Sequence, residues 1–116
     1  MTLKSAIDYI DSIRPNAFTD EQKTMWINEI EGKVQSEILL FAPSQMISYS
    51  YQNDMDTELL AAPPHDNVYT SYLCAMLDFA HAEYNRYNKS LQLFNANFNE
   101  YMRWFAKHYR PADAVI

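Results

Sequence analysis

The side chains best suited to hold a metal ion form an acidic cluster near the middle of the chain. Asn53, Asp54, Asp56 and Glu58 supply the oxygen ligands that calcium prefers. A calcium loop of the EF-hand type also needs a glycine at its sharp turn and a bidentate glutamate at its twelfth position. The cluster contains no glycine, and the twelfth position counted from Asp54 is His65. We interpret the cluster as a solvated acidic loop and predict no metal site.

The remaining candidates for chemistry are equally isolated. His65, His81 and His108 have no second ligand four residues away, so no helix face presents a pair of metal ligands. The single glycine, Gly32, falls in a helix interior, which excludes a phosphate-binding loop, a nucleophile elbow and a dinucleotide fingerprint. The single cysteine, Cys74, lies in an apolar run and is expected to be a buried, reduced thiol. The sequence therefore predicts neither an enzyme nor a cofactor.

Composition limits the class of protein. A chain of 116 residues is long enough for one domain with a hydrophobic core, so we expect residues 1–116 to fold as a single domain. The hydrophobic content of 48% argues against disorder. The net charge of -6 disfavours nucleic-acid binding, which needs clustered Lys and Arg. No apolar run approaches the roughly 20 residues of a membrane span, and no signal peptide is recognisable, so we expect a cytoplasmic protein.

Two helices are expected in the first third of the chain. The apolar residues of the first helix recur at helical spacing before Pro15: Leu3, Ile7, Ile10 and Ile13. The second helix begins after Thr19, which forms a capping-box pattern with Gln22, and ends near Leu40. Its inward-facing residues are expected to be Trp26 or Ile27, then Ile30, Val34 and Ile38. Glu29 and Lys33 have the spacing of a surface ion pair.

The next segment, residues 41–65, has no helical period. Within it a weak alternation of period two favours extended structure: Met46, Ser48 and Ser50 alternate with Ile47, Tyr49 and Tyr51. A connection of this length is uncommon in a compact domain and is typical of functional segments. We therefore expect a long irregular or partly extended arm between the second and third helices.

Helical periodicity returns at Asp66, the expected N-cap, and continues to about Tyr109. One register runs through this half, with spacings that alternate between three and four residues beyond its first step: Leu73, Leu77, Ala80, Tyr84, Tyr87, Leu91, Phe94, Phe98, Tyr101, Phe105 and His108. The spacing predicts helix throughout. The fold class is therefore all-α, a small domain of about four helices.

The sequence leaves open whether residues 66–109 form one helix or a hairpin. A single helix of this length would extend about 65 Å, far longer than is usual in a domain of this size. Asn85, Asn88 and Ser90 have side chains that compete for backbone hydrogen bonds, which favours a turn between residues 81 and 90. One long helix, serving as a spine for assembly, is the alternative.

Aromatic residues point to protein interfaces. The chain has nine Tyr, six Phe and two Trp, more than helices that each bury one face are expected to absorb. Tyrosine combines an apolar body with a polar tip and is enriched where proteins meet. Our candidate interface residues are Tyr49, Tyr51, Leu59, Leu60, Tyr69, Tyr72 and Tyr109.

Several short sequence segments between Glu58 and Pro111 resemble those of a known protein family. The segments are ELLAAPPHD (58–66), Tyr69 with Tyr72 and Leu73, DFAHAEYNRYN (78–88), LFNA (93–96) with Tyr101, and HYRP (108–111). With them, about half of the chain resembles the head-tail connector or adaptor proteins encoded by tailed phages and prophages of low-GC Gram-positive bacteria. The chain departs from the family at His81-Ala82, where such proteins tend to have Asn-Gly.

The resemblance implies an all-helical structural subunit without catalytic activity. Such a subunit would assemble into a homo-oligomeric ring beneath the portal protein and, with tail-completion proteins, join a DNA-filled head to a tail. It would act in the host cytoplasm during assembly and then in the neck of the virion. A net negative chain also suits a DNA conduit, whose wall should repel DNA rather than bind it.

Two other function classes compete with the connector. A small helical regulator or inhibitor would bind one host protein through an acidic face and would be a monomer or dimer of fixed size. A helix-turn-helix DNA binder needs a basic recognition helix, whereas the second helix offers Lys23 and Lys33 against four acidic residues between Asp20 and Glu31. We therefore rank the DNA binder last.

Overall fold

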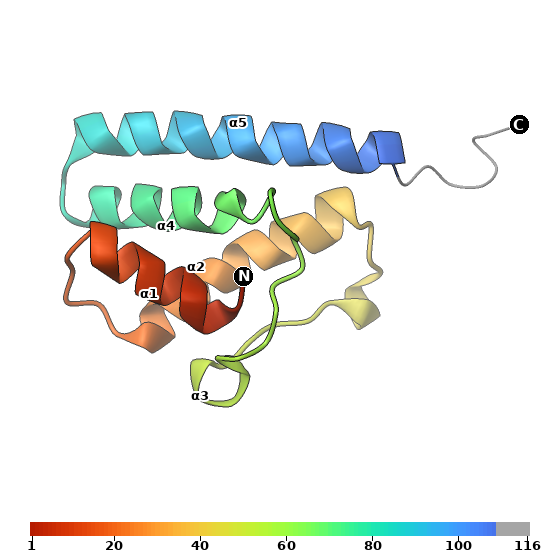
Figure 1. Cartoon of the computed structure of the whole chain (residues 1–116), viewed down its shortest axis with the longest axis horizontal. Helices are drawn as coiled ribbons and strands as arrows, with labels where there is room; N and C mark the ends of the chain where they lie inside the picture. Colours follow the sequence, from red (N-terminus) through yellow and green to blue (C-terminus); the bar gives the residue numbers. More distant parts are fainter. Residues whose placement is uncertain (109–116) are drawn as a thin grey trace, which may run out of the picture.

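The computed structural model describes residues 1–108, whose long helices lie in three layers (Figure 1). Helix α5 (Tyr84–His108) forms one outer layer, and α4 (Asn67–Ala80) packs beneath it. Helices α1 (Leu3–Ile13) and α2 (Asp20–Lys33) contact each other and cover the other side of α4. The middle helix, α4, is therefore packed on two sides, whereas one long face of α5 is exposed.

Three short elements complete the described chain. A π-helical turn, η1 (Val34–Ile38), continues α2; a 3-10 turn, η2 (Pro43–Gln45), and the one-turn helix α3 (Tyr51–Asp54) follow. No β-strand occurs within residues 1–108, so the all-helical prediction is confirmed, whereas residues 46–51 do not form a strand. Residues 1–108 contain five α-helices rather than the predicted four or so, because the short helix α3 forms inside the segment expected to be irregular.

Local sequence signals explain where the first helices begin and end. The capping box is present, because the Thr19 side chain accepts from the Gln22 N–H while the Gln22 side chain accepts from the Thr19 N–H. After η1 the backbone of Leu40 takes a left-handed conformation, φ 56°, which ends the helical path at the predicted place. The predicted ion pair is wrong, since Lys33 pairs with Glu37.

Helices α4 and α5 form a hairpin, so the turn predicted between residues 81 and 90 is confirmed and the single long helix is excluded. The predicted cause is wrong, because Asn85, Asn88 and Ser90 all lie inside α5. The chain reverses instead through Ala82, whose φ is 58°, a conformation that costs more for alanine than for glycine.

Buried Asp78 fixes the corner where the hairpin turns. Its Oδ2 accepts a hydrogen bond from the Ser90 hydroxyl at 2.7 Å, and its Oδ1 pairs with the Arg14 guanidinium at 3.2 Å. The Glu83 N–H also donates to the Asp78 carbonyl. One residue of α4 is thus bonded to the end of α1 and to the first half of α5.

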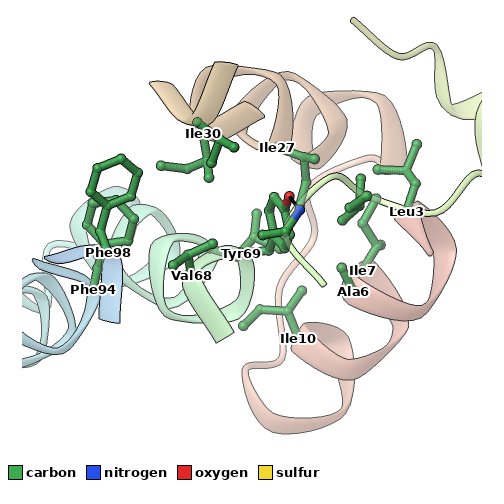
Figure 2. Packing of buried hydrophobic residues seen from close by; sticks show 14 of the residues in the cluster. Leu3, Ala6, Ile7, Ile10, Ile27, Ile30, Val68, Tyr69, Phe94 and Phe98 are labelled. Carbon is green, nitrogen blue, oxygen red and sulfur yellow. Dashed lines mark hydrogen bonds between the residues drawn. The ribbon is translucent and has the colours of Figure 1, made fainter. Parts of the chain in front are cut away.

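The core lies between α4 and its neighbours (Figure 2). Val68 and Tyr69 of α4 sit in the middle, with the α1 side chains on one side and Phe94 and Phe98 of α5 on the other. The predicted registers agree with burial for most residues. The exceptions are exposed: Ile13 and Tyr84, at 40% and 58%, with Ala80 and His108. Buried members of the predicted registers are Leu3, Ile7, Ile10, Ile27, Ile30, Val34, Ile38, Leu73, Leu77, Phe94, Phe98 and Tyr101.

Candidate interaction surfaces

The residues first considered for metal or catalytic chemistry do not come together. Within residues 1–108 no three His, Cys, Asp or Glu side chains are grouped so that they could hold a metal ion. His65 is buried against aromatic rings of α5, His81 follows the end of α4, and His108 ends α5. None of the helices in this range has the length and hydropathy of a membrane span.

Residues 41–65 are attached to the helical body by side-chain amides. The Asn28 amide donates to the Tyr49 carbonyl at 2.9 Å and accepts from the Tyr49 N–H at 2.8 Å. The Gln35 amide pairs in the same way with Ile47, at 3.0 Å and 2.7 Å. Two amides thus replace the neighbouring strand that an extended segment would pair with. Ile47 and Tyr49, two residues apart, thus bond through their backbone groups to η1 and α2.

Glu31 lies between these two amides on the same side of the helix and is fully buried. Its carboxylate accepts from the Tyr49 hydroxyl, the Tyr69 hydroxyl and, at 3.0 Å, the Leu60 N–H. A buried carboxylate is costly unless donors compensate it, and here three donors from the arm and α4 do so. We call Asn28, Glu31 and Gln35 the polar ladder.

The polar ladder perturbs the tyrosines that it binds. Burial, and then the hydrogen bond and charge of Glu31, raise the pKa of Tyr49. Burial, followed by the charge of Glu31 and its hydrogen bond, raises the pKa of Tyr69 still further. Both hydroxyls therefore remain protonated donors to Glu31 well above neutral pH.

Three predicted interface residues are core residues. Tyr69 is fully buried, Leu59 is 4% exposed and Tyr49 is 9% exposed. Their placement corrects the prediction, because the Tyr49 and Tyr69 hydroxyls satisfy Glu31 inside the subunit rather than a partner outside it. Some of the aromatic residues counted as surplus are therefore buried inside the subunit, where their hydroxyls are hydrogen-bonded.

The other interface candidates remain near the surface or lie outside the described range. Tyr51, Leu60 and Tyr72 are partly exposed. The Tyr72 hydroxyl donates to the exposed Glu29 carboxylate, and burial, followed by this bond and charge, raises the pKa of Tyr72. Tyr109 lies outside the described residues.

Large apolar side chains that the sequence analysis did not select are exposed at both ends of the hairpin. Near the end of α5, Leu39, Leu40, Met102 and Phe105 line a groove of about 490 Å³, and Leu40 is 75% exposed. At the turn between α4 and α5, Phe79 contacts Tyr84 and Tyr87, with ring centroids 6.0 Å and 5.2 Å apart. We call these surfaces the end groove and the turn cluster.

A third apolar surface lies between α1 and α5. Tyr9, Ile13 and Leu93 line a groove of about 290 Å³ and are 51%, 40% and 56% exposed. Tyr9, Phe79 and Leu93 all lie outside the predicted inward-facing registers. A large apolar residue at an outward-facing helix position is the sequence signal that could have predicted these exposed surfaces.

Charge is also divided between the layers. Residues 1–83 contain four Lys or Arg and thirteen Asp or Glu, a net charge of -9. Helix α5 contains four Lys or Arg and one Glu, a net charge of +3. An acidic body therefore carries one basic helix on its outer side (Figure 1).

The comparisons with known proteins concern the whole chain. Searches of protein-family models, of curated proteins and of solved structures gave no match.

Proposed function

We propose that the chain is a structural subunit, a phage head-tail connector that assembles into a ring under the portal protein and joins head to tail. The observation that carries the proposal is the exposure of large apolar side chains in three separate places: Leu40 in the end groove, Phe79 and Tyr84 in the turn cluster, and Tyr9, Ile13 and Leu93 in the groove between α1 and α5. Exposed apolar clusters with polar rims are typical of sites where proteins bind one another.

Three separate surfaces are more consistent with a connector subunit that binds several partners than with a regulator that binds one. A ring subunit uses two different surfaces for its two neighbours, because a head-to-tail contact joins unlike patches. A connector needs further surfaces for the head and for the tail. The end groove and the turn cluster lie at opposite ends of the α4–α5 hairpin, which makes them suitable for different partners.

The sequence segments that resemble connector proteins support the same proposal. Within residues 1–108 they include residues 58–66, the turn, six of the fourteen residues of α4 and eleven of the 25 residues of α5. The arm end and α4 are joined by a hydrogen bond from the Ala61 N–H to the Tyr69 hydroxyl at 2.8 Å. The resemblance thus falls on elements that follow one another in the chain, from residue 58 to the end of α5.

Residues 41–65 form a docking arm in this proposal. The polar ladder holds its extended part on the body of the free subunit, while Met46 and Ile47 remain 39% and 45% exposed. These two side chains, rather than buried Tyr49, are the apolar contacts that the arm offers to a neighbour.

The proposal is tested by reconstitution. Filled heads and free tails are prepared from a phage strain that lacks the gene, and the purified chain is added to the mixture. We expect the chain to restore joined, infectious particles, whereas the same chain unfolded by heat should not. No gain in infectivity with folded protein, at any concentration tested, would contradict the proposal.

One observation favours a second candidate, the small regulator of a host protein. The net charge of -9 on residues 1–83 would suit docking on a basic partner. A regulator predicts a complex of fixed stoichiometry with one host protein and no effect on the joining of heads to tails. The reconstitution experiment therefore separates the two candidates.

A further inference from the structure

The outward face of α5 carries four exposed basic side chains and one exposed acidic side chain, Glu100. Arg86, Lys89, Arg103 and Lys107 are all exposed. None of them forms an ion pair within residues 1–108. They contrast with the basic residues of the body, which are all paired: Lys4 with Asp8, Arg14 with Asp78, Lys23 with Asp11 and Lys33 with Glu37.

Three of these side chains share one stripe of the helix. Lys89 and Lys107 are about five helical turns apart, and Arg103 lies about one turn before Lys107, so the stripe is about 27 Å long. It lies opposite the buried side of α5, which faces α4 through Phe94 and Phe98. Glu100, one turn before Arg103, lies on the same face, so the stripe has a net charge of +2.

The complementary charge lies at the other edge of the molecule. Figure 1 places α3 and α5 at opposite edges, with α4 and the layer of α1 and α2 between them. Helix α3 contacts both α1 and α2. Asp8 pairs with Lys4 at 2.6 Å, and Asp11 and Asp20 pair with Lys23 at 2.6 Å and 3.9 Å, while the exposed Asp56 follows α3. These four carboxylates and two lysines carry a net charge of -2. A subunit cannot bring its own α5 stripe to this surface.

We propose, on the basis of the connector function proposed above, that the basic stripe of α5 binds the acidic α1–α3 surface of a second copy of the chain. The contact joins two unlike surfaces, so each copy retains a free surface of each kind and can bind another copy. Such heterologous association closes into a ring when the rotation between neighbours divides a full turn, and otherwise continues as a filament.

The contact is expected to be weak in isolation and sensitive to salt. Exposed ion pairs contribute little individually, and salt screens them. A ring gains strength because each subunit is held at two contacts at once. Association should therefore increase at low ionic strength and high protein concentration.

Charge reversal with rescue tests the proposal. The basic-stripe variant is Arg103→Glu with Lys107→Glu, and the acidic-surface variant is Asp8→Lys with Asp56→Lys. All four side chains are exposed. The fourfold variant combines the changes and restores the net charge of the wild type. Circular dichroism checks that each variant is folded, and sedimentation velocity measures association at low and at high salt.

We expect the wild type to form oligomers at low salt that dissociate at high salt. Each double variant should remain monomeric, and the fourfold variant should associate again because its two surfaces are once more complementary. A folded fourfold variant that stays monomeric, a basic-stripe variant that associates like the wild type, or a wild type that never associates would each overturn the proposal.

A DNA-binding control accompanies the sedimentation measurements. A duplex DNA oligonucleotide is titrated into the wild type, because DNA is the other polyanion that a basic stripe could bind. DNA binding that the basic-stripe variant loses, without self-association of the wild type, would assign the stripe to nucleic acid and overturn the proposal. The reconstitution of heads and tails does not depend on which surfaces join the copies, so the connector function can stand if this contact fails.

Discussion

The side-chain amide of Asn28 binds Tyr49 at both polar groups of its backbone, as one strand binds another. The distances of 2.8 Å and 2.9 Å are those of ordinary backbone pairing, and Gln35 repeats the arrangement at Ile47. Glu31 completes the ladder by binding the Tyr49 hydroxyl. Three polar side chains of α2 and η1 therefore bind the segment around Ile47 and Tyr49 to the helical body.

Removing the central member of the ladder should destabilise the fold. Glu31→Ala leaves the Tyr49 hydroxyl and the Leu60 N–H without their buried acceptor and removes one of the partners of Tyr69. We expect the free energy of unfolding in urea to fall by about 3 kcal/mol or more, because each buried unsatisfied group costs about 1–3 kcal/mol. The exposed Glu37→Ala is the control, and equal effects of the two substitutions would contradict the role of Glu31.

Amide exchange should reveal which parts of the arm the ladder holds. In the free protein we expect the amides of residues 41–65 to exchange faster than those of α4. Within the arm, Ile47 and Tyr49 should exchange more slowly than Ser48, because their N–H groups donate to Gln35 and Asn28. NMR-detected hydrogen exchange measures both. Protection of the whole arm equal to that of α4 before assembly would argue against a docking arm.

The inward stripe of α5 should carry much of the stability. Phe98 is 3% exposed and packs beside Phe94, so Phe98→Ala should lower the free energy of unfolding by about 3–5 kcal/mol. Leu93→Ala, on the exposed side of the same helix, should change it by about 0.5 kcal/mol or less. Thermal unfolding of both variants checks the register, and a reversed order of the two effects would refute it.

The buried tyrosines should make stability fall at alkaline pH. The folded-state pKa values of Tyr49 and Tyr69 are raised above the value of about 10 expected in the unfolded chain. Above that pH the unfolded chain releases protons that the folded chain keeps, so unfolding is favoured as pH rises; below about pH 9 these groups cause no pH dependence. Each such tyrosine should contribute a slope of about 1.4 kcal/mol per pH unit above pH 10.

Tyr69→Phe isolates this contribution. Above pH 10, the free energy of unfolding of the variant should fall less steeply with pH, by about 1.4 kcal/mol per pH unit, whatever its stability at neutral pH. Tyr84→Phe, on the surface, is the matched control. Urea unfolding at a series of pH values gives the slopes. Identical slopes for the wild type and Tyr69→Phe would show that Tyr69 is not the titrating group.

Local signals in the sequence were sufficient for much of the fold. The capping box of Thr19 and Gln22 involves neighbours in the chain, and the periodic spacing of Phe94, Phe98 and Tyr101 depends on helix geometry alone. Asp66 was correctly placed just before a helix, yet its carboxylate binds the amino group of Met1 rather than capping that helix. A bond between residues 65 positions apart leaves no periodic trace in the sequence.

The polar ladder was missed for a related reason. Glu31 lies four residues after Ile27 and three before Val34, which places it on the inward side of the helix, but an acidic residue there reads as a surface charge until its donors are known. Those donors come from the arm and from α4. The same limit applies to Ala82, because an alanine gives no local signal of the left-handed conformation that glycine adopts at less cost.

Electron microscopy of lysates from a phage strain that lacks the gene tests the connector function most directly. Heads and tails assemble on separate pathways, so the account predicts DNA-filled or leaking heads beside complete, unattached tails. Expression of the wild-type chain from a plasmid should restore joined particles. Complete and infectious virions in the deletion lysate would contradict the account.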